Sequence, residues 1–182
     1  MRWTLSTATY PSLTWNVPWM SYAACMRIVA YGTPAPQGSK KPMRNQHTGK
    51  IVTIENSPNL APWRQDVKYA AEVVLTEAGR PQPFAGAVVM RMVFTFARPT
   101  SVKRGKRPWP SVYPDLSKLA RAVEDALVAA GVMKDDALIV EYTRLAKVYS
   151  GEDEEALDRP GVLILIGELV DSLSIGGGSP GK

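Results

Sequence analysis

The chain has 182 residues, 45% of them hydrophobic, which is enough to bury one sizeable core and does not require a second domain. A formal net charge of +5 and a sequence pI near 9.4 favour a polyanionic partner such as nucleic acid. Because Cys25 is the only cysteine, an intrachain disulfide and a cysteine zinc site are excluded, and a reducing compartment is expected. No stretch approaches the roughly 20 apolar residues that span a bilayer, so we expect no membrane partner.

The two ends of the chain are predicted to lie outside the folded domain. Residues 1–25 make a poor signal peptide because Pro11, Asn16 and Pro18 interrupt the apolar run, so we expect a peripheral or mobile extension. Residues 170–182 are rich in glycine and serine and predict a flexible tail. The folded domain is therefore expected to span residues 26–169.

The first half of this domain combines strand and helix patterns. Residues 26–32 alternate apolar side chains and predict a strand, and Thr48 and Gly49 predict the turn of a short hairpin. A helix is expected to begin near Pro62 and to end at Gly79. Its expected inward-facing residues are Trp63, Val67, Ala70, Val74 and Leu75.

The second half begins with residues 87–97, which are rich in β-formers and predict a central strand. Residues 117–130 have helical spacing, and Gly131 is expected to end that helix in a left-handed conformation. Two strands follow at 137–149 and 161–169, of which the last is the stronger. These elements predict a single small α/β domain with a mixed β-sheet packed by two main helices. The inward-facing residues of the second helix are expected to be Leu119, Ala120, Val123, Leu127 and Ala130.

Two basic segments are candidates for DNA binding. Residues 98–109 carry five cations and a tryptophan without an intervening acid, and proline and glycine keep the segment irregular. Such cations can neutralise phosphates while the indole stacks on an unpaired base, or the indole can anchor a solvated loop to the core. The second segment, near the predicted hairpin, is expected to form the other wall of a groove. The candidates are Arg98, Lys103, Arg104, Lys106, Arg107 and Trp109 in the first segment, and Lys40, Lys41, Arg44 and Lys50 in the second.

Other features of these segments are expected to carry no chemistry. The glycine and lysine residues near Gly38 do not follow the order of a phosphate-binding loop, so no nucleotide cofactor is expected. The single histidine, His47, lies in a turn-like stretch and is expected to be solvated.

On the second helix, Arg121 and Asp125 have the spacing of an exposed ion pair, and Glu124 is expected on the same solvated face.

Acidic residues flank the second predicted helix. Asp115 precedes the helix, and Asp135 and Asp136 follow it. Carboxylates are the hard oxygen ligands that Mg²⁺ prefers, so these three acids are candidate metal ligands. A structural interpretation is open as well, because Asp115 can cap the helix and an Asp pair can form a turn.

The segment PDLSKLARAVEDALVAAGVMKDDALIVEYTRLAKVY resembles the central motif of the RusA family of phage and prophage Holliday junction resolvases, in which D-L-D-x-L precedes a helix ending D-A-L-x-x-A-G and then D-D-A. The stretches GTPAPQGSKKP and SPNLAPWRQDV also look like that family, so the similarity extends from about Met26 to Leu169. The resemblance implies a RusA-like fold and a homodimeric, Mg²⁺-dependent endodeoxyribonuclease, with Mn²⁺ as a plausible substitute. It further implies binding of four-way DNA junctions, paired cuts, and a cytoplasmic location in a bacterial or phage-infected cell.

The resemblance also implies roles for individual residues. Asp115 matches the first motif acid, Asp136 the acid after the helix, and Asp135 its auxiliary neighbour, so these acids would hold the metal ion that activates water. Arg121 stands where the family carries a functionally important lysine, and its guanidinium is expected to bind phosphate but not to act as a deprotonated amine. The adjacent Lys118 is also expected to contact DNA.

Ser117 departs from the family pattern, since it stands where the motif has its second acid. A hydroxyl can bind a cation weakly or hold a metal-bound water, but it lacks the charge that attracts Mg²⁺, so we expect impaired activity. Two hypotheses follow: an endonuclease of branched DNA, and a junction-binding protein that no longer cuts. Other branched or flapped nucleic acids are a third, weaker substrate class.

Overall fold

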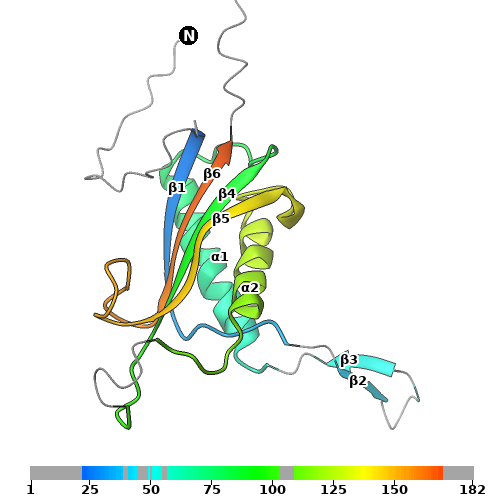
Figure 1. Ribbon diagram of the computed structural model, residues 1–182. Coiled ribbons are helices and arrows are strands. Elements are labelled where there is room, and N and C mark those ends of the chain that lie inside the picture. Colours follow the sequence, from blue (N-terminus) through cyan, green and yellow to red (C-terminus); the bar gives the residue numbers. More distant parts are fainter. Residues whose placement is uncertain are drawn as a thin grey trace, which may run out of the picture.

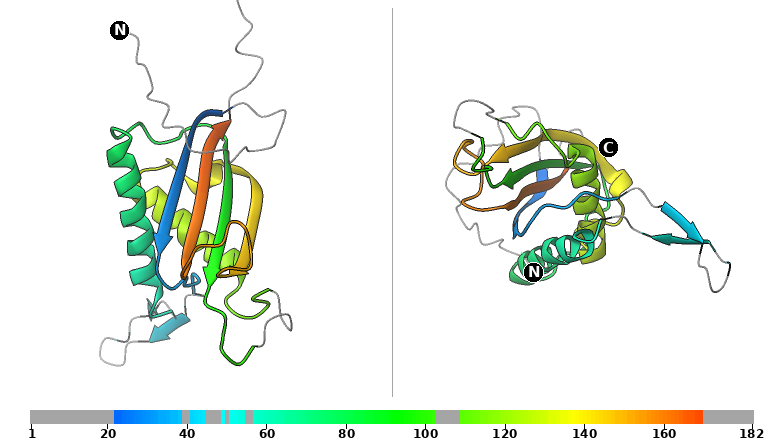
Figure 2. Two further views of the ribbon diagram at one scale, coloured as in Figure 1. Left: turned by 90° about the vertical axis from the view of Figure 1, so that its left-hand side faces the viewer. Right: turned by 90° about the horizontal axis from the view of Figure 1, so that it is seen from below.

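The computed structural model describes residues 22–38, 41–44, 49, 51–54, 57–102 and 109–169. A four-stranded sheet has the strand order β1-β6-β4-β5, and β2 and β3 pair separately as a hairpin. Both helices lie on one face of the four-stranded sheet (Figures 1 and 2). The elements in chain order are β1 (Tyr22–Tyr31), β2 (Lys41–Arg44), β3 (Ile51–Ile54), α1 (Leu60–Glu77), β4 (Val88–Phe96), α2 (Leu116–Ala130), the 3₁₀ turn η1 (Asp136–Leu138), β5 (Ile139–Tyr149) and β6 (Gly161–Leu169).

The sheet is mixed, which confirms the predicted fold class. β6 pairs antiparallel with both β1 and β4, whereas β4 and β5 pair in parallel. Parallel neighbours need a crossover connection, and α2 supplies it. α2 therefore runs back along the sheet from the carboxyl end of β4 to the amino end of β5 (Figure 1).

Most predicted boundaries agree with the structure to within two residues. α1 begins at Leu60 rather than near Pro62, and α2 begins at Leu116. The larger difference is β1, which begins at Tyr22 instead of Met26 because its first residues pair with the end of β6. The rest of the predicted extension at 1–25, and the predicted tail at 170–182, lie outside the described residues.

The main core lies between the helices and the sheet. β4 and β6 are the central strands and are almost completely buried, as expected for a strand with neighbours on both edges. Gly131 ends α2 with φ of 81°, which confirms the predicted left-handed stop. Among the described residues, no helix is long and apolar enough to cross a membrane. The predicted inward-facing residues Trp63, Val67, Leu75, Leu119, Ala120, Val123 and Leu127 are buried, whereas Ala70, Val74 and Ala130 are only half-buried.

A smaller apolar cluster on the opposite face of the sheet is covered by the connection from β5 to β6. The backbone N–H of Leu157 in this connection donates a 2.9 Å hydrogen bond to Oγ1 of Thr95, the one buried polar side chain in the described part of the chain. Arg144 on β5 pairs with Asp153 and Glu155, and this contact is the main reason why the pKa of Asp153 lies below its ordinary value. The connection between β5 and β6 therefore contacts the sheet in two ways: Leu157 packs in the apolar cluster, and Asp153 and Glu155 form ion pairs with Arg144.

We predict that Thr95→Val lowers the free energy of unfolding by about 1–3 kcal/mol, because the nearly isosteric valine leaves the buried N–H of Leu157 without its acceptor. Urea denaturation measures the change. The control is Thr76→Val on α1, where the hydroxyl is exposed and donates to the carbonyl of Glu72, so its effect should stay within about 0.5 kcal/mol. Equal losses in the two variants would contradict the assigned role of Thr95.

Candidate active site

Asp115 lies at the start of α2 with its carboxylate turned to solvent. It occupies the cap position of the helix with an extended backbone, but its side chain makes no capping hydrogen bond. The carboxylate is instead 3.2 Å from Nζ of Lys118 one turn later, and its side chain is 58% exposed. The helix-cap interpretation of Asp115 therefore does not describe its side chain, which is accessible to a ligand.

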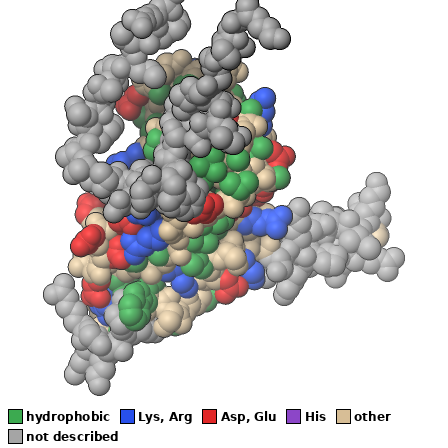
Figure 3. All heavy atoms as spheres, turned by 45° about the horizontal axis from the view of Figure 1, so that its top comes forward, with side chains coloured by type: hydrophobic (Ala, Val, Ile, Leu, Met, Phe, Trp, Pro, Cys, Tyr) green, Lys and Arg blue, Asp and Glu red, His purple; other side chains and the backbone are tan. Residues whose placement is uncertain are grey.

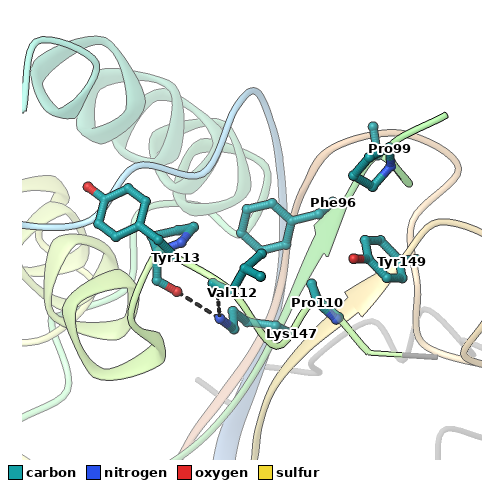
Figure 4. A pocket seen from close by; sticks show the side chains of 9 residues that line it. Phe96, Pro99, Pro110, Val112, Tyr113, Lys147 and Tyr149 are labelled. Atoms are coloured by element: carbon teal, nitrogen blue, oxygen red, sulfur yellow. Dashed lines mark hydrogen bonds between the residues drawn. The ribbon is translucent and has the colours of Figure 1, made fainter. Parts of the chain in front are cut away.

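Lys147 on β5 holds the segment that leads into Asp115. Its Nζ donates hydrogen bonds of 2.7 and 2.8 Å to the carbonyl oxygens of Val112 and Pro114 (Figure 4). Burial lowers the pKa of Lys147, and the nearby Asp115 acts in the opposite direction. Sequence analysis missed this contact, although the period-two spacing from Leu145 places Lys147 on the same face of β5.

Ser117 and Arg121 follow Asp115 on α2, and both are exposed. Ser117 is in the first turn of the helix, and Arg121 is one turn further along. Since residues four apart lie on the same side of a helix, the hydroxyl and the guanidinium are directed to the same surface. This surface adjoins Asp115, so the predicted residues at the amino end of α2 do form one local group.

The two acids after α2 differ from each other. Asp135 accepts a 2.8 Å hydrogen bond from the backbone N–H of Ala137, so it forms the turn that opens η1, as the structural interpretation of the Asp pair predicts. Asp136 begins η1 and is half-buried. Asp136 is therefore the acid of this pair whose side chain has no assigned structural role.

Within one protomer, the acids at the two ends of α2 do not meet. The 15 residues of α2 span about 22 Å at 1.5 Å per residue, with Asp115 before the first and Asp136 beyond the last. Mg²⁺ contacts its ligands at about 2.0–2.1 Å, so one ion cannot bind both acids of the same chain. In the described part of the chain, no group of three or more acid, histidine or cysteine side chains is arranged to hold a metal ion. Asp115 therefore does not lie beside Asp135 and Asp136 within one chain, and the role of the three acids as metal ligands stays a prediction.

Glu124 is a second acidic side chain close to Asp136. It accepts a 2.5 Å hydrogen bond from the hydroxyl of Tyr142 on β5. Burial is the main cause that raises the pKa of Glu124, and the negative charges of Asp136 and Asp125 contribute. Glu124 is thus half-buried and bound to β5, whereas the sequence predicted a solvated residue.

Asp125 forms an ion pair with Arg64 and not with Arg121, the partner that helical spacing predicted. Its carboxylate is 3.5 Å from the guanidinium of Arg64 on α1, so the ion pair joins the two helices instead of linking Asp125 to Arg121 within α2. Arg121 is consequently left on the exposed surface beside Ser117.

The described residues of the predicted DNA-binding segments lie at the end of the sheet where α2 begins. Figures 1 and 2 show the β2–β3 hairpin and the segment between β4 and α2 at this end. Trp109 is 67% exposed, so its indole does not anchor the loop to the core. The guanidinium of Arg98 pairs with Glu152 and lies 4.4 Å from the centroid of the Tyr149 ring. Lys41 and Arg44 lie on β2, and Lys40, His47, Lys50, Lys103, Arg104, Lys106 and Arg107 lie outside the described residues.

Charges of both signs are interspersed on the face of the molecule that Figure 3 shows, the grey atoms aside. The described residues on this face therefore do not form one broad basic patch, and a large part of the predicted positive charge lies in the two basic segments.

The family model for endodeoxyribonuclease RusA matches residues 32–156. The chain belongs to the RusA family. The matched residues include both basic segments and the whole of α2 with its flanking acids. Membership of this family supports the general function of an endonuclease that resolves Holliday junctions. Comparison with the curated proteins gives no match.

For this RusA-family chain we predict that Lys147→Met loosens the segment before Asp115. Loss of the two hydrogen bonds to Val112 and Pro114 should lower the free energy of unfolding by about 1–2 kcal/mol and speed amide exchange at residues 109–119. Denaturation and hydrogen exchange measure the two effects. Lys134→Met, at the opposite end of α2, is the control. Unchanged exchange before Asp115 would show that Lys147 does not hold this segment.

Proposed function

We propose that this RusA-family chain is a homodimeric Holliday junction resolvase that makes paired, Mg²⁺-dependent cuts, and that each metal site combines Asp115 of one protomer with the partner's Asp136. The observation that supports the proposal is the separation of these two acids along α2. If both acids bind the same ion, they must come from different chains.

A twofold axis across α2 meets this requirement. Two copies of α2 related by such an axis run antiparallel, so the amino end of one helix lies beside the carboxyl end of the other. Asp115 of each protomer then approaches the partner's Asp136, and the dimer has two equivalent sites. Because closed symmetric dimers use the same surface on both chains, the two sites would act on symmetry-related strands of a four-way junction.

The side of the molecule formed by α2 and β5 favours this arrangement. β5 is an edge strand of the sheet, and one of its backbone edges has no partner strand in the described residues. Val140 is 60% exposed on this strand, and Tyr142 is also exposed. Exposed edge strands with apolar side chains are usually covered, and a second copy of the chain would cover this one.

The residues of the chain have separable roles in this proposal. Asp115 and the partner's Asp136 supply the negative charge that binds Mg²⁺, which when bound provides a Lewis acid for the phosphate and lowers the pKa of water. Arg121 holds the phosphate next to the cut by its guanidinium, and Lys118 neutralises an adjacent phosphate. Lys147 fixes the segment that carries Asp115. The hydrogen bond between Tyr142 and Glu124 joins β5 to α2, the two elements that flank η1 and Asp136.

The second candidate function is a junction-binding protein that does not cut, and Ser117 favours it. Ser117 is exposed in the first turn of α2, two residues after Asp115, so its side chain can face a bound ion but contributes no charge. Both candidate functions use the same predicted DNA-binding surface. They differ only in whether a site with Ser117 in place of an acid still supports cutting.

The test is cleavage of a labelled four-way junction with Mg²⁺, compared with a linear duplex of the same sequence. We predict slow, metal-dependent cutting by the unmodified chain, about 10²-fold faster cutting by Ser117→Asp, and junction binding without cutting by Asp136→Asn. The control is Ser57→Asp, which adds the same charge ahead of α1 and should not accelerate cutting.

Two outcomes would decide against the first candidate. Cutting by Ser117→Asp alone would identify the chain as a junction-binding protein. Equal affinity for junction and duplex in every variant would contradict both candidates.

A further inference from the structure

A pocket of about 160 Å³ lies beside Asp115 at the end of the sheet. It is formed by the ends of β4 and β5 and by the segment that leads into α2 (Figure 4). Pro114 lines the pocket, and the next residue along the chain is Asp115. Consecutive Cα atoms are about 3.8 Å apart, so a ligand in the pocket lies next to the candidate metal ligand. The lining includes Phe96, Pro110, Val112, Tyr113, Lys147 and Tyr149.

The pocket presents flat apolar groups to solvent. Tyr113 is 72% exposed and Val112 is 49% exposed, and both line the pocket. In Figure 4, Val112 lies beside Phe96, and the ring of Tyr113 extends outward at the margin of the group. Trp109, which precedes the lining residue Pro110, is also exposed but does not line the pocket. Aromatic and proline faces arranged around a small opening are suited to a planar ring that stacks on them.

The size of the pocket limits what it can hold. Apolar cavities of roughly 150 Å³ hold one benzene-sized ring. The pocket therefore has room for one ring of a nucleobase, but not for a base pair or a helix.

One polar group inside the pocket can orient such a ring. The Lys147 ammonium has three N–H donors, and two of them bind the carbonyl oxygens of Val112 and Pro114. The third is left for an acceptor on the edge of a ligand. A small number of polar groups in a mostly apolar pocket is the usual way in which small ligands are oriented.

We infer that this pocket binds one unpaired nucleobase of the DNA strand whose phosphate lies at Asp115. The inference rests on the proposed function and adds a contact to it: the base leaves its pair, stacks on Tyr113 and accepts a hydrogen bond from Lys147. Phosphate contacts at α2 and base contacts in the pocket would then hold the same nucleotide from two sides.

The test compares two four-way junctions in EDTA, so that no cutting occurs. One carries a mismatch, and the other an abasic nucleotide, at the same position near the crossover, and the position is moved stepwise along each strand. Neither junction has a base pair at that position, so their difference in affinity isolates the base. We expect the mismatched junction to bind about 5-fold or more tightly than the abasic one at one position.

Matched variants assign this preference to the pocket. Ala97 is exposed and lines the pocket, so Ala97→Phe fills it, whereas Ala78→Phe places the same ring at the exposed end of α1. The preference should disappear in Ala97→Phe and persist in Ala78→Phe. Tyr113→Ala should also lose it, whereas Tyr69→Ala removes an equally exposed tyrosine elsewhere and should keep it.

The inference is overturned if the unmodified chain shows no preference at any position, or if Ala97→Phe and Tyr113→Ala retain it. Failure of the proposed function gives a different result, namely equal affinity for junction and linear duplex. In that event, the same mismatch and abasic nucleotide placed in the linear duplex still decide whether the pocket binds a base.

Discussion

The length of α2 is the constraint on which the organisation of the candidate site depends. The helix connects two parallel neighbouring strands, so it must run the length of the sheet and leave its two ends at opposite edges of the domain. Asp115 and Asp136 flank this helix and are consequently separated by about 22 Å. The acids of the motif therefore lie at two separate places in one chain, and the proposed twofold dimer would bring an acid of one chain to an acid of the other.

β5 contacts α2 and the segment before it through two side chains. Lys147 binds the carbonyl oxygens ahead of Asp115, and Tyr142 donates to Glu124 near Asp136. Asp115 also adjoins the apolar pocket, at the end of the sheet where the described residues of the β2–β3 hairpin and of the segment between β4 and α2 lie. One end of the domain therefore combines features that suit DNA binding, and the other end supplies the remaining acid.

Sequence patterns predicted the elements well because their apolar periods match the buried faces. Residues 161–169 form a strand with the predicted bounds, and the left-handed stop at Gly131 follows from the chemistry of glycine. The family resemblance identified the acids, and helical spacing predicted the helix between them, but the sequence could not show that this helix is a crossover between two parallel neighbouring strands. The contacts of Lys147 and Glu124 were missed because they join residues far apart in the sequence: Lys147 binds the segment before α2, and Glu124 binds Tyr142 on β5.

Mixing two inactive variants tests the composite site most directly. Asp115→Asn and Asp136→Asn, both prepared in the Ser117→Asp background, are allowed to exchange subunits, and cutting of a four-way junction is measured with Mg²⁺. If each site takes Asp115 from one protomer and Asp136 from the other, a mixed dimer has one intact site and one site with neither acid. The account predicts that the mixture nicks one strand of the junction while each variant alone is inactive. An inactive mixture in which mixed dimers are shown to form would contradict it.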